Sequence, residues 1–461
     1  MSEQPDWKRG SEMEEIAASL PWWSVLPFAG MLLSIAVFPL VKGEWWERSQ
    51  VKVALFWALV FCVPFGIAYG ADVLGYELVH ALATDYVPFI VLLFGLYTVA
   101  GGIAIKGSIA GTTKNNVILL LIGTALASWV GTTGAAMLLI RPVLRANAWR
   151  RNKKHLVVFF IFLVANMGGC LTPLGDPPLF LGYLRGVPFF WTLTNLAPLL
   201  VLNTAALIAL FAAIDYRLMR REIRAGRTPY PDEGAPREKI SIEGAHNIIF
   251  LAMIILGVVL NGALADLGEV YAINLVGDIT LGVNYFVQIA LILLAAFLSL
   301  KTTPATAHAH NEFEWGPIKE VASLFIGIFI TMIPALLLLE ANGQNLGIDT
   351  PFKFFWSTGL LSSFLDNSPT YVVFLATAGA LGATTGIPTT VGFVAPQILL
   401  AISAGAVFMG AMTYIGNAPN FMVKSIAESK QVKMPSFFGY IGWSLCILAP
   451  LFLLDSFLFF L

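Results

Sequence analysis

Apolar stretches of about 20 residues recur along the whole chain and restrict its fold more than any other feature. A helix of that length spans the hydrocarbon core of a bilayer, where every backbone polar group must be hydrogen-bonded internally. Only 12% of the 461 residues are charged and 57% are hydrophobic, whereas about 25% of the residues in soluble domains are charged. We therefore predict an all-α polytopic membrane protein.

The windows predict about ten transmembrane helices, five before and five after a basic segment. They cover residues 25–41, 52–70, 87–105, 156–184, 189–213, 246–264, 283–300, 321–340, 389–429 and 436–460. A polar leader with a predicted surface helix, 1–24, precedes the first helix. The basic segment, 215–245, is predicted to be a cytoplasmic linker.

Two further apolar segments, 115–146 and 351–383, are each too short for two spans and are interrupted near the middle. We interpret both as re-entrant hairpins. Each half of the chain then has three crossings, a hairpin and two more crossings. Because five crossings move the start of the second half to the other side of the membrane, the halves 25–214 and 246–461 must be inverted repeats.

The fourth and ninth crossings, 156–184 and 389–429, contain related motifs. LTPLGDPPLFL runs from Leu171 to Leu181, and MTYIGNAPNFM runs from Met412 to Met422. Glycine and proline interrupt a helix and free backbone carbonyls, so both crossings should be unwound. One such break usually reflects packing alone. Breaks at matching places in two halves instead indicate a transporter's binding site.

Basic residues establish the orientation. They follow the first hairpin, fill the linker and end the ninth crossing, as Arg145, Arg150, Arg151, Lys153, Lys154, Arg217, Arg220, Arg221, Arg224, Arg227, Lys424, Lys430 and Lys433. The positive-inside rule places all of them in the cytoplasm. The first hairpin then enters from the cytoplasm and the second from outside, with both termini outside.

Oxygen-bearing side chains gather at the four breaks. The hairpin tips carry Thr132, Thr133, Asp366, Asn367 and Ser368, and the unwound crossings carry Thr172, Asp176, Thr413, Asn417 and Asn420. Hydroxyl, amide and carboxylate oxygens are suitable ligands for a hard cation such as sodium. We predict that these residues bind ion or substrate, with sodium at Asp366, Asn367 and Asn417.

Two carboxylates distinguish the breaks. A carboxylate at the bilayer centre costs roughly 2.5–3.5 kcal/mol, so Asp176 and Asp366 should face water, carry a proton or bind a cation. Proton and sodium then compete for one group, which is the minimum chemistry of an antiporter. Asp176 precedes a proline and is equally well explained as a helix cap. Asp366 is the stronger candidate, because Asn or Ser would serve a turn without the charge.

Other polar residues allow narrower predictions. Arg141 is a candidate anion ligand, although an arginine near a cytoplasmic end usually extends to the headgroups. Interhelical hydrogen bonds are predicted for Asn166, Asn203, Asn261 and Gln397. The net charge of −1 gives no reason to expect a nucleic-acid partner. The sequence shows no nucleotide, zinc or nucleophile motif, so we expect an ion gradient as the energy source and no enzymatic activity.

The break motifs resemble the ion transporter superfamily, which includes D-type sodium/proton antiporters, arsenite permeases, and citrate and divalent-anion symporters. GTTGAA at Gly131–Ala136, NMGGCLTPLGDPP at Asn166–Pro178, DNSPTY and TYIGNAPN carry the resemblance. It implies an elevator-type transporter and a homodimer. We expect a multi-pass protein of a prokaryotic cytoplasmic (inner) membrane, in contact with lipid.

The chain departs from the symporter pattern. In divalent-anion symporters the hairpin tips carry Ser-Asn-Thr, whereas Gly131–Gly134 has no Asn and Asp366 brings a negative charge where a carboxylate would be received. Like charges disfavour that substrate. The departure favours exchange of Na⁺ or Li⁺ for H⁺. Citrate or dicarboxylate symport with Na⁺ or H⁺ is the alternative, and arsenite efflux is a third. Sodium and protons would be the coupling ions, with no other cofactor.

Overall fold

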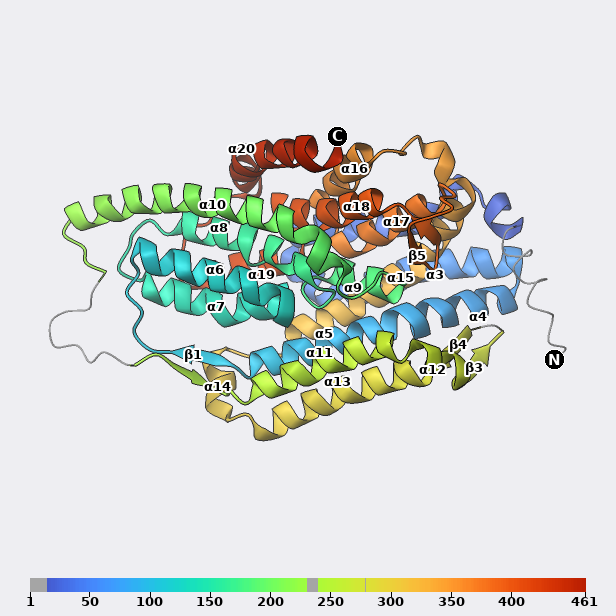
Figure 1. Ribbon diagram of the computed structural model, residues 1–461, viewed down its shortest axis with the longest axis horizontal. Coiled ribbons are helices and arrows are strands. Elements are labelled where there is room, and N and C mark those ends of the chain that lie inside the picture. The colour runs from blue at the N-terminus through green and yellow to red at the C-terminus, as the bar shows by residue number, and fades with distance from the viewer. Residues whose placement is uncertain (1–14, 230–238, 278) are drawn as a thin grey trace.

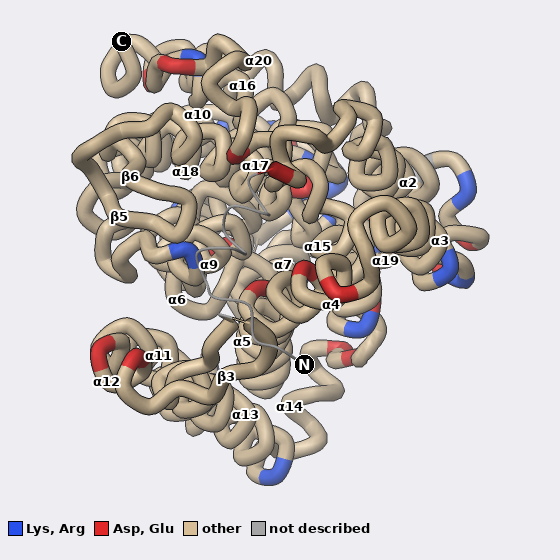
Figure 2. The backbone as a smooth tube through the Cα atoms, turned by 90° about the vertical axis from the view of Figure 1, so that its right-hand side faces the viewer, with Lys and Arg blue, Asp and Glu red and all other residues tan. Residues whose placement is uncertain are grey.

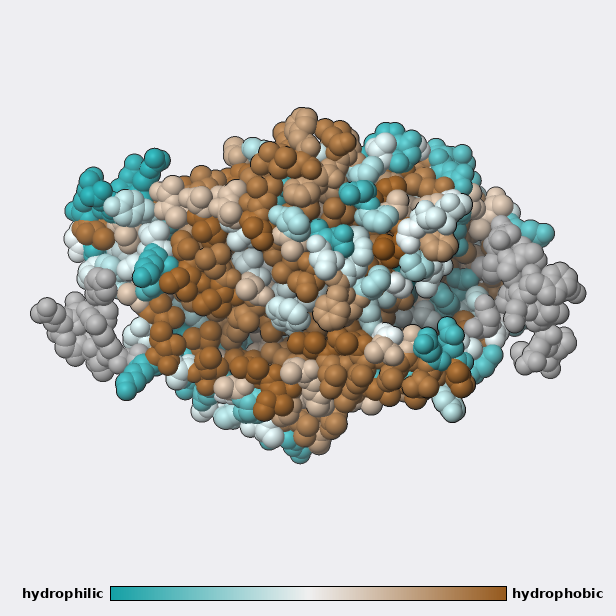
Figure 3. All heavy atoms as spheres, in the orientation of Figure 1, coloured by the Kyte–Doolittle hydropathy of each residue, from teal (hydrophilic) through white to brown (hydrophobic). Residues whose placement is uncertain are grey.

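The computed structural model describes residues 15–229, 239–277 and 279–461, so most of the predicted leader 1–24 lies outside the described residues. Nine helical segments in this part are long and apolar enough to cross a membrane: Trp22–Pro39, Gly43–Tyr69, Ala71–Gly101, Thr113–Val130, Lys154–Leu171, Trp191–Arg224, Val283–Thr302, Gly316–Leu346 and Phe437–Phe460. Apolar side chains cover the middle of the surface and polar ones gather towards its two ends (Figure 3). The chain is an all-α polytopic membrane protein.

One group of helices comes from the first part of each half, and we call it the frame. It consists of α2 (Leu26–Val41), α3 (Gly43–Tyr69), α4 (Ala71–His80), α5 (Val87–Gly101), α11 (Asn247–Ala263), α13 (Val283–Thr302) and α15 (Gly316–Asn342). Within it α3 packs on α2 and α15, while α13 packs on α5 and α11. The frame helices α4, α5, α11 and α13 run along the lower side of the molecule in Figure 1.

The second group contains both hairpins and both interrupted helices, and we call it the hairpin unit. It consists of α6 (Thr113–Val130), α7 (Thr132–Ala146), α8 (Lys154–Leu163), α9 (Pro177–Leu184), α10 (Trp191–Arg224), α16 (Pro351–Phe364), α17 (Asn367–Gly379), α18 (Pro396–Met409), α19 (Ala418–Ser429) and α20 (Phe437–Asp455). When the molecule is viewed down its long axis, α11 and α13 lie on one side and α10, α16, α18 and α20 lie on the other (Figure 2). The two groups meet where α5 packs on α7 and α15 packs on α17.

Strands in the described residues are short antiparallel pairs outside the helices. They are β1 (Ala104–Lys106) with β2 (Ser241–Glu243), β3 (Ala272–Val276) with β4 (Ile279–Gly282), and β5 (Ile387–Thr389) with β6 (Gly392–Val394). Two short helices, α12 (Ala265–Val270) and α14 (Ala305–His310), lie between frame helices. The β1–β2 pair joins the residues after α5 to the residues before α11, across the linker.

Several helix limits differ from the sequence windows. The window predicts that the third crossing starts at residue 87, but its helical run begins at Ala71 and passes through a π-helical turn, η2 (Ala81–Tyr86). Asp72 and Asp85 lower the mean hydropathy of that stretch, which hid it. Likewise, α10 continues to Arg224, beyond the end of its window at residue 213. The window ends early because the last turns of α10 carry basic side chains, which lower the mean hydropathy.

Candidate functional site

The first hairpin reverses direction at one glycine. α6 ends at Val130, Gly131 adopts φ +79°, and α7 begins at Thr132. Positive φ is readily accessible to glycine because it has no Cβ. The backbone N–H of Thr132 then donates to the carbonyl of Gly175 at 2.8 Å. The hairpin tip is thereby bonded directly to the first unwound crossing.

The second hairpin turns by a different device. α16 ends at Phe364 and α17 begins at Asn367, with Asp366 as its N-cap. The Asp366 carboxylate accepts a hydrogen bond from the backbone N–H of Ser368 at 2.9 Å, which satisfies a free donor at the helix start. Asp366 is half-buried. It is occupied as a helix cap at the tip.

Both interrupted crossings are present as predicted. In the first, α8 ends at Leu163 and α9 starts at Pro177, with the short 3₁₀ segment Met167–Leu171 between them. In the second, α18 ends at Met409 and α19 starts at Ala418, with Gly410–Met412 between them. Proline near each restart has no N–H and is compatible with the first helical turn.

The two hairpin–break junctions use matching hydrogen bonds. Thr172 Oγ1 donates to the carbonyl of Ser128, and Thr413 Oγ1 donates to the carbonyl of Ser363 at 2.5 Å. The hydroxyls of the same two serines donate to the interrupted helices: Ser128 Oγ donates to Gly168 O at 2.5 Å, and Ser363 Oγ donates to Met409 O at 3.1 Å. Both acceptors lie four residues before the threonine. The two halves therefore build the same junction from equivalent positions.

A pair of glycines closes each break in the same way. A Cβ added to Gly175 would lie 2.1 Å from the carbonyl oxygen of Gly169, and a Cβ added to Gly416 would lie 2.6 Å from that of Gly410. Side chains at these positions would collide with backbone. The close approach explains why glycine occupies both places.

Asp176 lies where all four breaks meet. Its side chain is 0% exposed. Oδ1 accepts hydrogen bonds from Thr132 Oγ1 at 3.2 Å and from Asn417 Nδ2 at 3.1 Å, while Oδ2 accepts one from Asn367 Nδ2 at 2.8 Å. We call these four residues the central cluster. Aligning the two motifs pairs Asp176 with Asn417, and aligning the tips pairs Thr132 with Asn367.

A second set of amides supports the central cluster. Asn166 Nδ2 donates to Asn420 Oδ1 at 2.6 Å, and Asn166 Oδ1 accepts from Asn417 Nδ2 at 3.3 Å. Asn420 in turn donates to the carbonyls of Gly410 and Thr413 at 2.8 and 2.9 Å. Asn166 and Asn420 are both 0% exposed. This chain of amides links one break to the other and orients Asn417.

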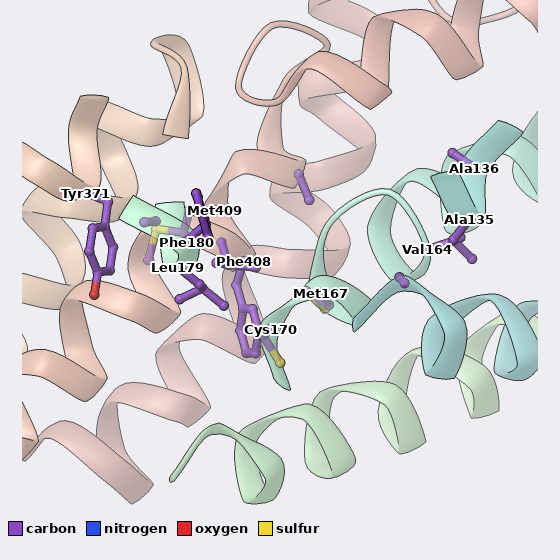
Figure 4. Packing of buried hydrophobic residues seen from close by; sticks show 14 of the residues in the cluster. Ala135, Ala136, Val164, Met167, Cys170, Leu179, Phe180, Tyr371, Phe408 and Met409 are labelled. Carbon is purple, nitrogen blue, oxygen red and sulfur yellow. The ribbon is translucent and has the colours of Figure 1, made fainter. Parts of the chain in front are cut away.

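Fully buried apolar side chains flank the two breaks. Met167 and Cys170 come from the first break, and Phe408 and Met409 end α18 beside the second (Figure 4). Leu179 and Phe180 of α9 belong to the same cluster and, like the others, are at most 1% exposed. The central cluster therefore lies in a dry environment, where hydrogen bonds and charges interact more strongly than in water.

The predicted site residues divide into three sets. Thr132, Asn367 and Asn417 each donate to Asp176, and Asn420 supports this cluster through Asn166. Thr172 and Thr413 hold the junctions, Ser368 and Asp366 form the cap, and Thr133 is half-buried beside Thr132. Asp176 does occupy the N-cap position of α9, as the cap alternative predicts, but its side chain makes no cap hydrogen bond to that helix. Asp366, which the sequence favours as the ion ligand, makes a cap hydrogen bond, whereas Asp176 lies in the central cluster.

The polar residues expected to join helices mostly do so. Asn166 bonds Asn420, Asn203 bonds Asp455, and Asn261 bonds Gln288. Gln397, at the start of α18, is exposed instead.

Arg141 lies away from the central cluster, at the basic end of the molecule. Its Nη2 is 3.1 Å from Glu312 Oε2, and Lys430 Nζ is 3.1 Å from the other oxygen, Oε1. The hydrogen bond from Lys430 and then that from Arg141 hold the pKa of Glu312 below its usual value. Because Glu312 follows α14 and both cations belong to the hairpin unit, this ion pair joins the unit to the frame.

A second ion pair joins the two groups at the opposite end. Arg185, just after α9, donates to Asp85 of η2 at 2.7 Å, and both residues are 7% exposed. The backbone of Arg185 also accepts from Thr390 N at 2.9 Å. The hairpin unit is therefore attached to the frame by charge at both ends.

A cavity of about 300 Å³ lies beside the second break. Tyr414, three residues before Asn417, forms part of its wall, and Lys424 and Phe421 of α19 form another part. Tyr414 donates to the carbonyl of Pro435 at 3.1 Å. None of the four residues of the central cluster lines this cavity.

Sequence reasoning did not single out Ser128 and Ser363. The signal was available, because aligning ASWVGTT (127–133) with SSFLDNS (362–368) on the hairpin tips places one serine on the other. For Asn166 the sequence predicts only a helix-joining role. Asn166 begins the motif NMGGCLTPLGDPP, but the motif does not indicate its contact with the opposite break, which required the structure.

Comparison with known families was made on the whole chain. The family described as "Putative citrate transport" matches residues 17–460. No curated protein matches the chain. The match covers both hairpins, both breaks and every residue of the central cluster. The chain belongs to this citrate-transport family and, with it, to the citrate-transporter-like branch of the ion transporter superfamily, whose members are secondary transporters.

Proposed function

We propose that this secondary transporter exchanges sodium, or lithium, for protons, and that Asp176 is the group for which the two cations compete. The observation that supports the proposal is the central cluster. A carboxylate of the first break that is 0% exposed receives only neutral ligands, drawn from both hairpins and the second break. None of the ion pairs in the described residues includes Asp176.

Neutral ligands make the charge state of Asp176 depend on a small cation. A bare carboxylate in a dry site loses several kcal/mol of hydration that neutral hydrogen bonds replace only in part. A proton cancels the charge covalently, and sodium cancels it by coordination. The amides of Asn367 and Asn417 donate to the carboxylate here, and rotation of either amide would present an oxygen to sodium.

The matched junctions support an inverted-repeat architecture for the hairpin unit. Thr172 and Thr413 make equivalent bonds, and the glycine pairs of the two breaks make equivalent close approaches. We further propose that the hairpin unit moves as one body against the frame, as an elevator does. The unit contains all four breaks, so the central cluster would travel intact while the ion pairs of Asp85 and Glu312 with the unit break and re-form.

Citrate or dicarboxylate symport is the second candidate, because the family description names citrate. The central cluster offers such an anion no direct cationic partner in the described residues. A coupling sodium would have to lie between Asp176 and the substrate. Arg141, the predicted anion ligand, is bound to Glu312 at the basic end and would act only on entry or release. We propose a homodimer in a prokaryotic cytoplasmic membrane for either candidate.

Reconstitution in liposomes that contain a pH-sensitive dye separates the candidates. Exchange predicts proton flux when sodium or lithium is added, in the absence of citrate, and no such flux with potassium. Symport predicts flux only when citrate or succinate is present. Absence of any sodium-dependent proton flux without a carboxylate, between about pH 6 and pH 9, would exclude the exchanger.

A further inference from the structure

A second carboxylate is buried in the membrane-spanning part of the hairpin unit. Asp455, in the last turn of α20, is 0% exposed. Both of its oxygens accept from one donor, Asn203 Nδ2 of α10, at 3.0 and 2.9 Å. The same Nδ2 also donates to the carbonyl of Leu199 at 2.9 Å. This contact joins α20 to α10.

No basic side chain among the described residues forms an ion pair with Asp455. It takes part in none of the ion pairs found among the described residues. The neighbouring contacts from α16 are Trp356 Nε1 to Ser456 Oγ at 2.9 Å and the packing of the Phe355 ring against Phe452 and Phe460. These groups do not titrate. An isolated ionised carboxylate in such a place costs roughly 2.5–3.5 kcal/mol.

Asp215 provides an internal contrast on the same helix, α10. It is also 0% exposed, but Arg150 donates to both of its oxygens and His155 contacts one of them at 2.8 Å. Thr113 supplies a further donor at 2.5 Å. α10 therefore carries one buried carboxylate, Asp215, that has charged partners. It also contacts a second buried carboxylate, Asp455, that has no charged partner among the described residues.

Asn203 has an unpaired oxygen next to Asp455. Its Oδ1 is buried and accepts no hydrogen bond from any described residue. An ionised Asp455 cannot help, because a carboxylate only accepts. A protonated carboxyl has one O–H donor. A carboxylic acid and a primary amide can then form two hydrogen bonds, N–H to acid carbonyl and acid O–H to amide oxygen. One proton would remove the buried charge and satisfy Asn203 Oδ1.

We propose that Asp455 is a second proton-binding site, in which the neutral acid pairs with Asn203 and holds α20 against α10. The site has a route to the transport chemistry, because α20 also packs on the second break. Tyr440 Oη donates to Ala411 O at 2.9 Å, and Ser444 Oγ donates to Met412 O at 2.6 Å. Loss of the proton loosens the helix that supports this break. The proposal goes beyond exchange at Asp176 and does not require it.

Infrared difference spectroscopy of the full-length protein in liposomes, titrated with pH, tests the site. The wild type should show, at neutral pH, a buried-acid carbonyl band that Asp455→Asn removes, whereas any band from a protonated Asp176 should persist in that variant and be lost only in Asp176→Asn. Asp215→Asn is the matched control and should leave the signal unchanged, because Arg150 keeps Asp215 ionised. A wild-type spectrum that Asp455→Asn does not alter at any pH would overturn the proposal.

A second variant guards against failure of Asp455→Asn to fold. Asn203→Leu keeps the carboxyl but removes the amide, so the acid signal should shift in frequency. An unshifted signal would refute the acid–amide pair. Thermal melting gives an independent readout: the wild type should lose stability as alkaline pH removes the proton, and Asp455→Asn should not. Equal pH dependence of melting in both proteins would also overturn the proposal. The infrared and melting measurements do not depend on sodium exchange, so they test Asp455 whatever the outcome of the exchange assay.

Discussion

Replacing Asp176 with asparagine tests the proposed exchange mechanism most directly. The variant keeps the size of the side chain but removes the charge. Hydrogen bonds to a charged group contribute about 1.5–3 kcal/mol, and each 1.4 kcal/mol is tenfold in an equilibrium constant. Loss of one charged ligand should therefore weaken sodium binding by about 10- to 150-fold. Proton competition should vanish altogether, because an amide does not titrate in this range.

The structure also predicts that this variant folds. The asparagine introduced by Asp176→Asn would retain one oxygen to accept from Thr132 and Asn417. Its new N–H₂ would face Asn367 Nδ2, and rotation of the Asn367 amide converts that clash into a hydrogen bond. Asp176→Leu differs, because it removes the acceptor of two buried donors, Thr132 Oγ1 and Asn367 Nδ2, at about 1–3 kcal/mol each, while Asn417 Nδ2 keeps Asn166 Oδ1.

Sodium-dependent proton flux in liposomes, at equal amounts of reconstituted protein, is the assay. Asp176→Asn should show no flux above empty liposomes. Asp366→Asn is the matched control: asparagine is as good a helix cap as aspartate, so this variant should exchange at close to the wild-type rate. Wild-type exchange in Asp176→Asn, or its loss only in Asp366→Asn, would refute the assignment of Asp176.

Three further predictions concern the supports of the site. The two cationic partners of Glu312 lower its pKa in the folded protein. The ion pair therefore stabilises the fold fully when the pH is above 4.5, the ordinary pKa of a glutamate, and this stabilisation disappears as the pH falls below that value. Glu312→Gln should remove this pH dependence of the melting temperature. Gly175→Ala should destabilise the protein by about 1–3 kcal/mol or more, since the new Cβ would lie 2.1 Å from a backbone oxygen. Gly442→Ala is the control, because no atom lies within 4 Å of its new Cβ, and it should change stability by at most about 1 kcal/mol. Equal melting temperatures of the two variants would contradict this prediction. Asp85→Asn should cost about 3–5 kcal/mol by leaving Arg185 buried and unpaired, and Arg185→Gln added to it should recover part of the loss, measured by melting of the single and double variants.

Local chemistry explains which parts of the architecture could be predicted. Gly131 turns the first hairpin because it adopts positive φ, and prolines restart both broken helices because they have no N–H. These effects act within a few residues, so sequence motifs reveal them. The run from Ala71 was missed because the partner of Asp85 is Arg185, 100 residues away. A hydropathy window treats such a charge as unpaired.

The roles of the two aspartates depended on contacts between distant segments. In the sequence, Asp176 and Asp366 each place a carboxylate at a predicted break, and either one could cap a helix. Which one caps is decided by side-chain direction: Asp366 bends back to its own helix, whereas Asp176 extends to Asn367, 191 residues away. Asn417 reaches it from another segment in the same way, and Asn166 reaches Asn417. Sequence spacing carries no information about those directions.

The pairing of Asp176 with Asn417 has an electrical consequence. Equivalent positions in two halves could have carried two carboxylates, but one of them is an amide. The central cluster therefore has a single negative charge, enough for one monovalent cation. With either a proton or a sodium ion bound, the net charge of the central cluster is zero, so the loaded cluster is neutral with either ion. One-for-one exchange at this cluster would then move no net charge across the membrane, and its rate would not respond to the membrane potential.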